Sequence, residues 1–286
     1  LGLGGHTESL LLNCPDIHVY AFDRDERALT AAAERLAPFE GRVTFIHATY
    51  DCIQSSLLEL GVESVDGIIA DLGISSLQLD DADRGMSFRA PGPIDMRMDQ
   101  GSGETALELI ARSSQDELAN LIYEYGEERA SRRIARCIVQ AHERGELSTT
   151  LDLRRAVVRA IGPRRVGGVD PATRTFQALR IAVNGELDQL DRLLSFAGEI
   201  IAPNGVVAIL SFHSLEDRRV KRALLDRTIW QRLTKKPIVA SEPEQRNNPR
   251  SRSAKLRAAR RLPDGVELAL EETLDFETPE PPKVVQ

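Results

Sequence analysis

Apolar and polar positions along the first hundred residues alternate between short runs typical of strands and longer stretches typical of helices. The apolar runs predict strands at 18–22, 43–47 and 65–71, and helical patterning occupies 26–36 and 53–60 between them. Strand and helix thus recur roughly every 20 to 25 residues, which is the rhythm of a doubly wound, mostly parallel sheet. We therefore expect an α/β fold with a Rossmann-like sheet.

The rhythm is interrupted in the middle of the chain. Residues 72–103 are rich in Gly and Pro, which predicts loops, and the following segment has helical patterning alone. Helices are expected there at 106–111, 116–125, 128–144 and 151–161. The predicted organisation is the first part of an α/β domain at 1–103, an inserted helical domain at 104–173, and the second part of the α/β domain at 174–286.

The α/β pattern returns after the insertion. A long helix is expected at 172–196, a turn at 203–205 and a buried strand at 206–210. Ser214 and Asp217 then form the pattern of a capping box, in which both side chains satisfy free amides at the start of a helix.

Composition and charge change this picture in one respect. With 286 residues and 42% apolar content the chain can bury a large core, which excludes the disordered and fibrous classes. The net charge of −7 argues at first against a nucleic-acid partner, but residues 1–126 carry 8 basic and 22 acidic side chains and residues 127–261 carry 28 and 15. This basic middle, with an exposed basic loop expected at 245–253, favours a polyanionic partner. An acidic tail follows, which we expect to be frayed at 276–286.

Cysteine usage and hydropathy indicate the compartment. Cys14, Cys52 and Cys137 are far apart, so the sequence predicts no disulfide framework and favours a reducing, cytoplasmic environment. No apolar run approaches the roughly 20 residues that a membrane span needs, and no signal peptide is visible. Because the sequence starts at Leu1 inside what reads as a functional loop, we expect a segment with a first strand to precede it, whose loss would compromise the fold.

A Gly-rich turn at the start of the chain is the first candidate binding element. In Gly2–His6, glycines would let backbone amides approach a ligand, and the helix N-terminus that follows favours negative charge. Asp23 lies 18 residues beyond Gly5, at the tip of a predicted strand, where an acid in nucleotide-binding folds accepts hydrogen bonds from ribose hydroxyls. The alternatives are an ordinary tight turn and an acid that serves the helix dipole, a role that suits Asp25 better.

The turn and Asp23 together favour a cofactor that contains adenosine. NAD usually requires a third glycine, where this sequence has Thr7, whereas S-adenosylmethionine carries no phosphate and needs only a looser turn. Tyr50 and Asp71 end the next two predicted strands and would face the same ligand, with Tyr50 either stacked on adenine or at the rim of the site. No metal is expected, since Cys, His and acidic residues do not cluster at short spacing.

Asp71 begins the segment Asp71–Ile74, which stands where methyltransferases acting on amino groups have a polar-Pro-Pro-aromatic motif. The lone pair of an exocyclic amine is delocalised into its ring, and a carboxylate that accepts the N–H restores nucleophilicity. The Pro-Pro-aromatic part is absent here, so Asp71 either acts on the amine or serves the cofactor.

Phe212 and His213 follow the last strong strand. Phe212 could stack on a base, and His213 could bond the base or move a proton, whereas the alternative is a buried Phe and a capping His. The segment 95–98 is either a gating loop or core packing.

Arginine clusters in the helical segment allow two interpretations. They are either a solvated helix face or, together with the basic stretch 218–261, a track that binds phosphates. The clustered residues are Arg129, Arg132, Arg133, Arg136, Arg164 and Arg165.

With these residues assembled, the chain resembles the MraW family, whose members methylate the N4 amine of a cytidine in bacterial 16S rRNA. The resemblance runs from Gly4 to about Arg261 and rests on several strings of residues in one order. The strings are Gly4–His6, Asp23–Asp25, Asp71–Asp80, Gly92–Met98, Tyr125–Glu128, Ala172–Ile181, Ser211–Arg218 and Arg252–Arg257.

The resemblance implies a class I S-adenosylmethionine-dependent methyltransferase sheet with an inserted helical domain. It implies 16S rRNA or the small ribosomal subunit as the partner, no membrane association, and an oligomeric state that is open, with a homodimer among the options. From the residues discussed above, we expect Asp71, Phe212 and His213 to act in the reaction. The cofactor contacts that the resemblance implies are Gly4, Gly5, His6, Asp23, Tyr50, Asp71 and Gln78.

This sequence departs from the family at two positions, since the family often has Phe where Tyr50 stands and commonly has Pro where Leu77 stands. The alternatives are a methyltransferase of another RNA or of a protein amine, and a nucleotide-binding regulatory or nicotinamide-dependent protein.

Overall fold

A computed structural model of the chain describes residues 1–163 and 169–266. The described chain forms two compact units, and each draws on separate stretches of sequence. The first unit contains 1–49 and 74–186, and the second contains 50–73 and the residues from 187 onward. Arg164, Arg165 and the predicted acidic tail at 276–286 lie outside the described residues.

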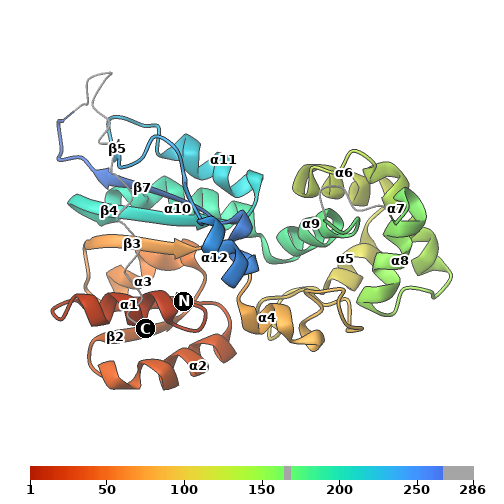
Figure 1. Ribbon diagram of the computed structural model, residues 1–286, viewed down its shortest axis with the longest axis horizontal. Coiled ribbons are helices and arrows are strands. Elements are labelled where there is room, and N and C mark those ends of the chain that lie inside the picture. Colours follow the sequence, from red (N-terminus) through yellow and green to blue (C-terminus); the bar gives the residue numbers. More distant parts are fainter. Residues whose placement is uncertain (164–168, 267–286) are drawn as a thin grey trace. The chain divides into compact units, whose positions relative to one another are not determined.

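The first unit begins with a small α/β motif (Figure 1). Its elements are α1 (Gly5–Asn13), β1 (Val19–Asp23), α2 (Glu26–Leu36), η1 (Ala37–Phe39) and β2 (Val43–His47). β1 and β2 pair in parallel, and Leu11, Ala32 and Leu36 form a buried core between the helices. Asp25 accepts the N–H of Arg27, which caps α2 and explains why the helix begins at Glu26.

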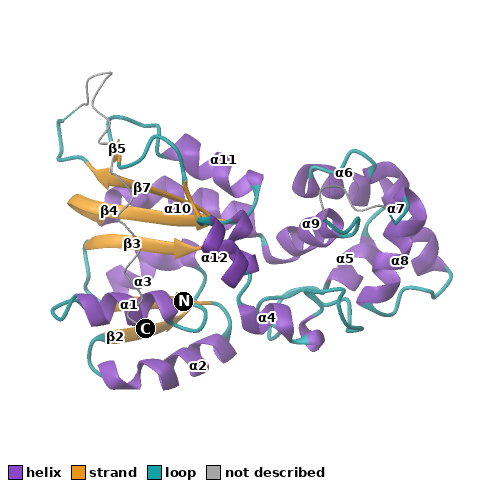
Figure 2. Ribbon diagram, viewed as in Figure 1, coloured by secondary structure: helices purple, strands orange, loops and turns teal. Residues whose placement is uncertain are grey.

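The remaining elements of the first unit are helices (Figure 2), and helices lie at each of the four places predicted between 106 and 161. These elements are α4 (Ser76–Asp80), η3 (Ala82–Arg84), α5 (Ala106–Arg112), α6 (Gln115–Gly126), α7 (Ser131–Glu143), α8 (Thr150–Ile161) and α9 (Thr173–Asn184). Thr105, Ser114 and Thr149 each form a capping box that starts α5, α6 and α8. The apolar faces of these helices form one buried core, with Ile122 and Ile134 fully buried at its centre.

The second unit is built around a five-stranded sheet. Its elements are η2 (Tyr50–Cys52), α3 (Ile53–Glu59), β3 (Val65–Asp71), α10 (Glu186–Ile200), β4 (Ile201–Ser211), α11 (Ser214–Ala223), β5 (Trp230–Arg232), β6 (Ile238–Val239), α12 (Glu242–Asn247), η4 (Pro249–Ser253) and β7 (Lys255–Arg261). The strand order is β3-β4-β7-β5, and β6 also pairs with β7. β3 is parallel to β4, whereas β7 is antiparallel to its neighbours.

The predicted α/β class is confirmed, but the strands do not form the single sheet that was expected. Within the described residues β1–β2 and β3–β4 belong to two separate sheets. On β1 the carbonyl of Phe22 accepts a hydrogen bond from the amine of Leu1 at 3.0 Å. Apolar alternation predicts that a segment is a strand but does not predict which edges pair, so this arrangement could not be read from the pattern.

The long helix predicted at 172–196 is wrong, because the structure has two helices there. Gly185 adopts a left-handed conformation with φ of 62°, which ends α9, and α10 begins at the next residue. Asn184 holds this break with its buried side chain, which donates to the Met96 carbonyl at 2.7 Å and accepts from the Met98 amide at 2.8 Å. The apolar periodicity continues across the break and therefore concealed it.

The turn and strand predicted after α10 are one element. β4 already starts at Ile201, and the turn predicted at 203–205 is an irregularity within it, where Asn204 has φ of 70° and the register with β3 shifts. The basic loop predicted at 245–253 is also wrong, since α12 ends and η4 lies there, although most of its side chains are exposed as expected.

The capping box predicted from Ser214 and Asp217 forms one residue earlier. His213 is the N-cap of α11, and Glu216 is its reciprocal partner. Asp217 instead pairs with Arg257 on β7 at 2.7 Å and with Lys255 at 3.4 Å. These charges come from a strand about 40 positions away, which local spacing could not anticipate.

Candidate active site

In the first unit the structure brings the Gly-rich turn and Asp23 together. The backbone amide of Gly2 donates to Oδ2 of Asp23 at 2.8 Å, and the amide of Asp25 donates to Oδ1 at 2.9 Å. Backbone amides thus orient Asp23, while 15% of its side chain stays exposed. This arrangement suits a carboxylate that accepts hydrogen bonds from the hydroxyl groups of a ligand.

The start of α1 is shaped by glycine. Gly4 is the N-cap with φ of 77° and offers no side-chain oxygen, so no side chain caps the first turn. A Cβ at Gly4 would lie 3.1 Å from the Leu36 side chain, so both the conformation and the space require glycine. Gly5 and His6 are exposed in this turn. A helix N-terminus without a side-chain cap has amides that suit an anionic ligand group.

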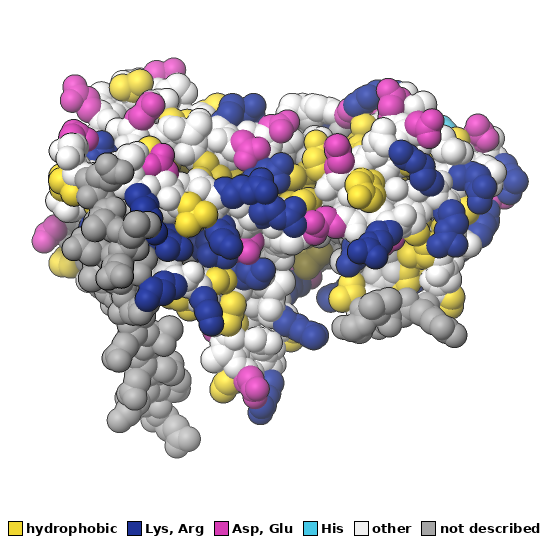
Figure 3. Space-filling view, turned by 90° about the horizontal axis from the view of Figure 1, so that it is seen from above, with side chains coloured by type: hydrophobic (Ala, Val, Ile, Leu, Met, Phe, Trp, Pro, Cys, Tyr) yellow, Lys and Arg dark blue, Asp and Glu magenta, His cyan; other side chains and the backbone are white. Residues whose placement is uncertain are grey.

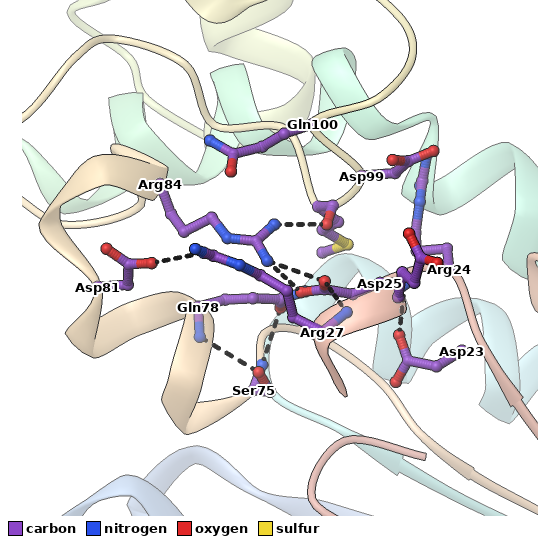
Figure 4. Close-up of polar contacts among 12 residues, drawn as sticks. Asp23, Arg24, Asp25, Arg27, Ser75, Gln78, Asp81, Arg84, Asp99 and Gln100 are labelled. Atoms are coloured by element: carbon purple, nitrogen blue, oxygen red, sulfur yellow. Dashed lines mark hydrogen bonds and ion pairs between the residues drawn. The ribbon is translucent and has the colours of Figure 1, made fainter. Parts of the chain in front are cut away.

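Gln78 lies inside a buried hydrogen-bond network (Figure 4). Its Nε2 donates to Oδ2 of Asp25 at 3.0 Å, and its Oε1 accepts the amide of Ser75 at 3.1 Å. Both ends of the amide therefore have partners within the unit. The structure connects Gln78 to Asp23 through Asp25, whose amide bonds Asp23.

Arg84 completes this network and was not identified from the sequence. Its Nη2 lies 2.7 Å and 2.8 Å from the two oxygens of Asp25, and its Nη1 donates to the Met98 carbonyl at 2.9 Å. Both charged side chains are almost fully buried, at 4% and 5% exposed. Burial of an ion pair is favourable only when the remaining polar atoms of both side chains are hydrogen bonded. Here the side-chain amide of Gln78 and the backbone amide of Arg27 also donate to the carboxylate of Asp25.

The segment 95–98 is packed into the core, which favours the packing alternative over a gating loop. Met96 and Met98 are buried in the helical core, and Met96 has a left-handed φ of 63°. Asp95 is buried beside Arg97, whose Nε donates to it at 2.8 Å. Burial alone would raise the pKa of Asp95, but the hydrogen bonds and charge of Arg97 outweigh it and lower the pKa.

In the second unit the ends of β3 and β4 bring Asp71 and Phe212 into one region. The parallel register pairs Asp71 with Leu210, two residues before Phe212. Gly73 follows with φ of 95°, and a Cβ there would lie 3.4 Å from Cδ2 of Phe212. Asp71 is exposed, Phe212 is half-buried, and half-buried Tyr50 starts η2 in the same unit. The neighbouring ends of β3 and β4 thus carry a carboxylate and an aromatic ring.

His213 adopts the capping role that was its alternative interpretation. Its Nδ1 accepts the amide of Glu216 at 3.5 Å, and its Nε2 lies 3.2 Å from Oε1 of Glu216. In return, Oε2 of Glu216 accepts the amides of Phe212 at 2.8 Å and His213 at 3.3 Å. The pair is mostly buried and holds the backbone of Phe212. A role for His213 in proton transfer stays a prediction.

Comparison with known proteins gives the family. The model of the MraW methylase family matches residues 1–262. The "Ribosomal RNA small subunit methyltransferase H" of Sorangium cellulosum is 64% identical over 269 residues, which cover 94% of this chain and 85% of that protein. Proteins of the same name from Prochlorococcus marinus and Nostoc punctiforme are 53% and 48% identical, covering 93% and 92% of this chain and 84% and 86% of their own. The resemblance seen in the sequence is therefore confirmed, and the chain belongs to the MraW methylase family.

Proposed function

We propose that this protein transfers a methyl group from S-adenosylmethionine to the N4 amine of a cytidine in 16S rRNA of the small ribosomal subunit. The observation that carries the proposal is the pairing of β3 with β4, which puts the exposed carboxylate of Asp71 and the ring of Phe212 at neighbouring strand ends. The names of the relatives point to ribosomal RNA of the small subunit as the substrate, and the model of the MraW methylase family matches residues 1–262.

The residues of the first unit fit the cofactor. S-adenosylmethionine has a ribose diol, for which the oriented carboxylate of Asp23 is an acceptor, and an amino acid carboxylate, for which the first-turn amides at Gly5 and His6 are donors. When bound, the cofactor would supply a methyl group made electrophilic by its sulfonium sulfur. Gly4 keeps the turn open, and Tyr50, Asp71 and Gln78 are further contacts that the family resemblance suggests.

Asp71 has the central role in the proposed reaction. Its carboxylate accepts a hydrogen bond from N4–H, which raises electron density on nitrogen. Asp71 would take the proton that N4 loses when the amine accepts the methyl group that the bound cofactor would supply. Phe212 stacks on the base, and the cap formed by His213 and Glu216 holds Phe212 in place.

The test is methylation of small ribosomal subunits that lack this modification. Purified protein, tritiated S-adenosylmethionine and such subunits should yield label on N4-methylcytidine in 16S rRNA. Label on a protein, or on another base, would contradict the proposed substrate. Calorimetry with S-adenosylmethionine and with NAD separates the cofactor alternatives, because binding of NAD alone would support a nicotinamide-dependent protein.

The proposed location is the cytoplasm, where ribosomal subunits are found. Among the described helices none combines the length and the apolar character needed to cross a membrane.

A further inference from the structure

Helix α7 of the first unit carries a row of arginines on the side opposite its buried face. Ile134 and Ile138 are fully buried against neighbouring helices, whereas Arg133, Arg136 and the C-cap residue Arg144 are exposed. With 3.6 residues per turn, these three arginines fall within an arc of about 80°. They therefore form one face of the helix.

These arginines lack partners within the described part of the chain. The side chains of Arg133, Arg136, Arg144 and the nearby exposed Arg129 make no ion pair or hydrogen bond with any described residue. We call these four residues the α7 arginine face. The absence of carboxylate partners among the described residues distinguishes this face from the paired arginines on α5 and α8.

Three other exposed arginines of the same helical segment are paired with carboxylates. Arg112 pairs with Glu104, Arg155 pairs with Asp152, and Arg159 lies 3.6 Å from Glu146. A solvated helix face usually has such pairs, because like charges three or four residues apart destabilise a helix. In the α7 arginine face, this repulsion is not offset by an ion pair with any residue of 1–163 or 169–266.

The charge and dimensions of the face suit a polyanion. The sequence of α7 contains a single carboxylate, Glu143, in its last turn. From Arg133 to Arg144 the helix rises about 16 Å, while phosphates in one strand of a duplex follow every ~3.4 Å along its axis. Guanidinium groups bind phosphate oxygens through paired N–H donors. Figure 3 shows Lys and Arg side chains gathered in groups on the face of the molecule displayed there.

We propose that the α7 arginine face binds the phosphate backbone of the rRNA substrate. This inference rests on the proposed function and adds a binding surface that is separate in sequence from Asp71 and Phe212. Contacts to phosphates position a nucleic acid without reading its bases, so the face contributes affinity for RNA and leaves the choice of cytidine to other residues.

The test compares two triple variants of equal charge. Arg133→Gln, Arg136→Gln and Arg144→Gln remove three of the four charges of the face. The control, Arg112→Gln, Arg155→Gln and Arg159→Gln, removes exposed arginines that already have partners. Binding to unmethylated small subunits is measured by filter retention across a salt series. The face variant should bind roughly 10- to 100-fold more weakly at low salt, and its salt slope should fall by about 2 to 3, because each of three lost phosphate contacts removes roughly 0.7 to 0.9.

Several results would show whether the α7 arginine face binds phosphates. Equal losses in both variants would reduce the effect to net charge and overturn the inference, as would an unchanged salt slope in the face variant. Lost binding to subunits with retained binding to protein-free rRNA would point to a ribosomal protein instead and would also overturn it. Affinity for S-adenosylmethionine should be unchanged in both variants. If the wild type itself methylates no subunits, the proposed function fails, whatever the variants do.

Discussion

The two units hold their candidate functional residues by different means. In the first unit, Asp23 and Gln78 are tied through hydrogen bonds to a buried ion pair between Asp25 and Arg84. In the second unit, Asp71 and Phe212 project from strand ends whose relative position follows from the β3–β4 register. A site held by a buried charge network depends on single side chains, whereas a site held by strand pairing depends on backbone geometry.

The largest expected effect concerns Asp71 in the second unit. Asp71→Ala should lower the rate of methyl transfer 10²- to 10⁴-fold, the usual contribution of a positioned proton acceptor. Single-turnover kinetics with labelled cofactor measures this. Asp71→Asn is the matched variant, since it keeps the shape and loses the charge. Full activity would remove Asp71 from the mechanism, and an effect confined to cofactor affinity would assign it to the cofactor alone.

Arg84 tests the charge network of the first unit. Arg84→Met leaves the buried carboxylate of Asp25 without its counter-charge, so the free energy of unfolding should fall by about 3–5 kcal/mol. Urea denaturation measures the change. The control is Arg154→Met, which breaks the more exposed pair with Asp170 and should cost less than about 1 kcal/mol.

Affinity for S-adenosylmethionine gives a second measurement for Arg84. Among folded molecules, Arg84→Lys should weaken cofactor binding, because Lys keeps the charge but cannot bond both Asp25 and the Met98 carbonyl in the same geometry. Arg154→Lys should leave the affinity unchanged. Equal effects of the two Lys variants on stability and affinity would show that the network has no special connection to Asp23.

Gly73 tests the backbone geometry of the second unit. Gly73→Ala forces a side chain into φ of 95° and places Cβ 3.4 Å from the Phe212 ring, so stability should fall by about 1–2 kcal/mol and KM for the RNA substrate should rise. Gly61→Ala is the control, because Gly61 has φ of 74° but nothing within 4 Å of an added Cβ. Similar stability losses with a KM change only at Gly73 are expected. A KM change in both variants would remove the link to Phe212.

The smallest effect is the pH dependence of Asp217, which joins α11 to β7. Burial opposes the shift, but the hydrogen bond and charge of Arg257, with the charge of Lys255, lower the pKa of Asp217 below its usual value. A lowered folded-state pKa means that the pair stabilises the protein at neutral pH and that this stability is lost as the pH falls below about 4. Asp217→Asn should flatten the acid side of the stability profile by less than about 1 kcal/mol, as measured by urea denaturation from pH 3 to 7. An unchanged profile would show that the pair contributes nothing.

Local patterns were sufficient for the elements that depend on local forces. The predicted bounds of α2, β2 and β3 coincide with those observed, because capping by Asp25 and short, mostly apolar runs act over a few residues. The same reasoning failed at Gly185, where periodicity continues across a break held by distant backbone groups of Met96 and Met98. It also misplaced the cap of α11, since a histidine is an unusual N-cap and Asp217 is engaged elsewhere.

For the candidate site, the sequence by itself determined which residue types are present and at which strand ends they stand. Asp23, Asp71 and Phe212 could be identified because residues that follow buried strands carry the chemistry of α/β folds. The charge pattern and the motif strings likewise indicated a polyanionic partner and the family.

Only the tertiary structure decided how these side chains are held and which charged side chains form ion pairs within the protein. Arg84 and Asp25 are 59 positions apart, and no spacing rule connects two charges that meet only after burial. The arginines of α7 that have no partner among the described residues could be distinguished from the paired ones on α5 and α8 only once their neighbours were known. The physical reason is that a strand or helix follows from nearby residues, whereas an ion pair depends on which distant segments the core brings together.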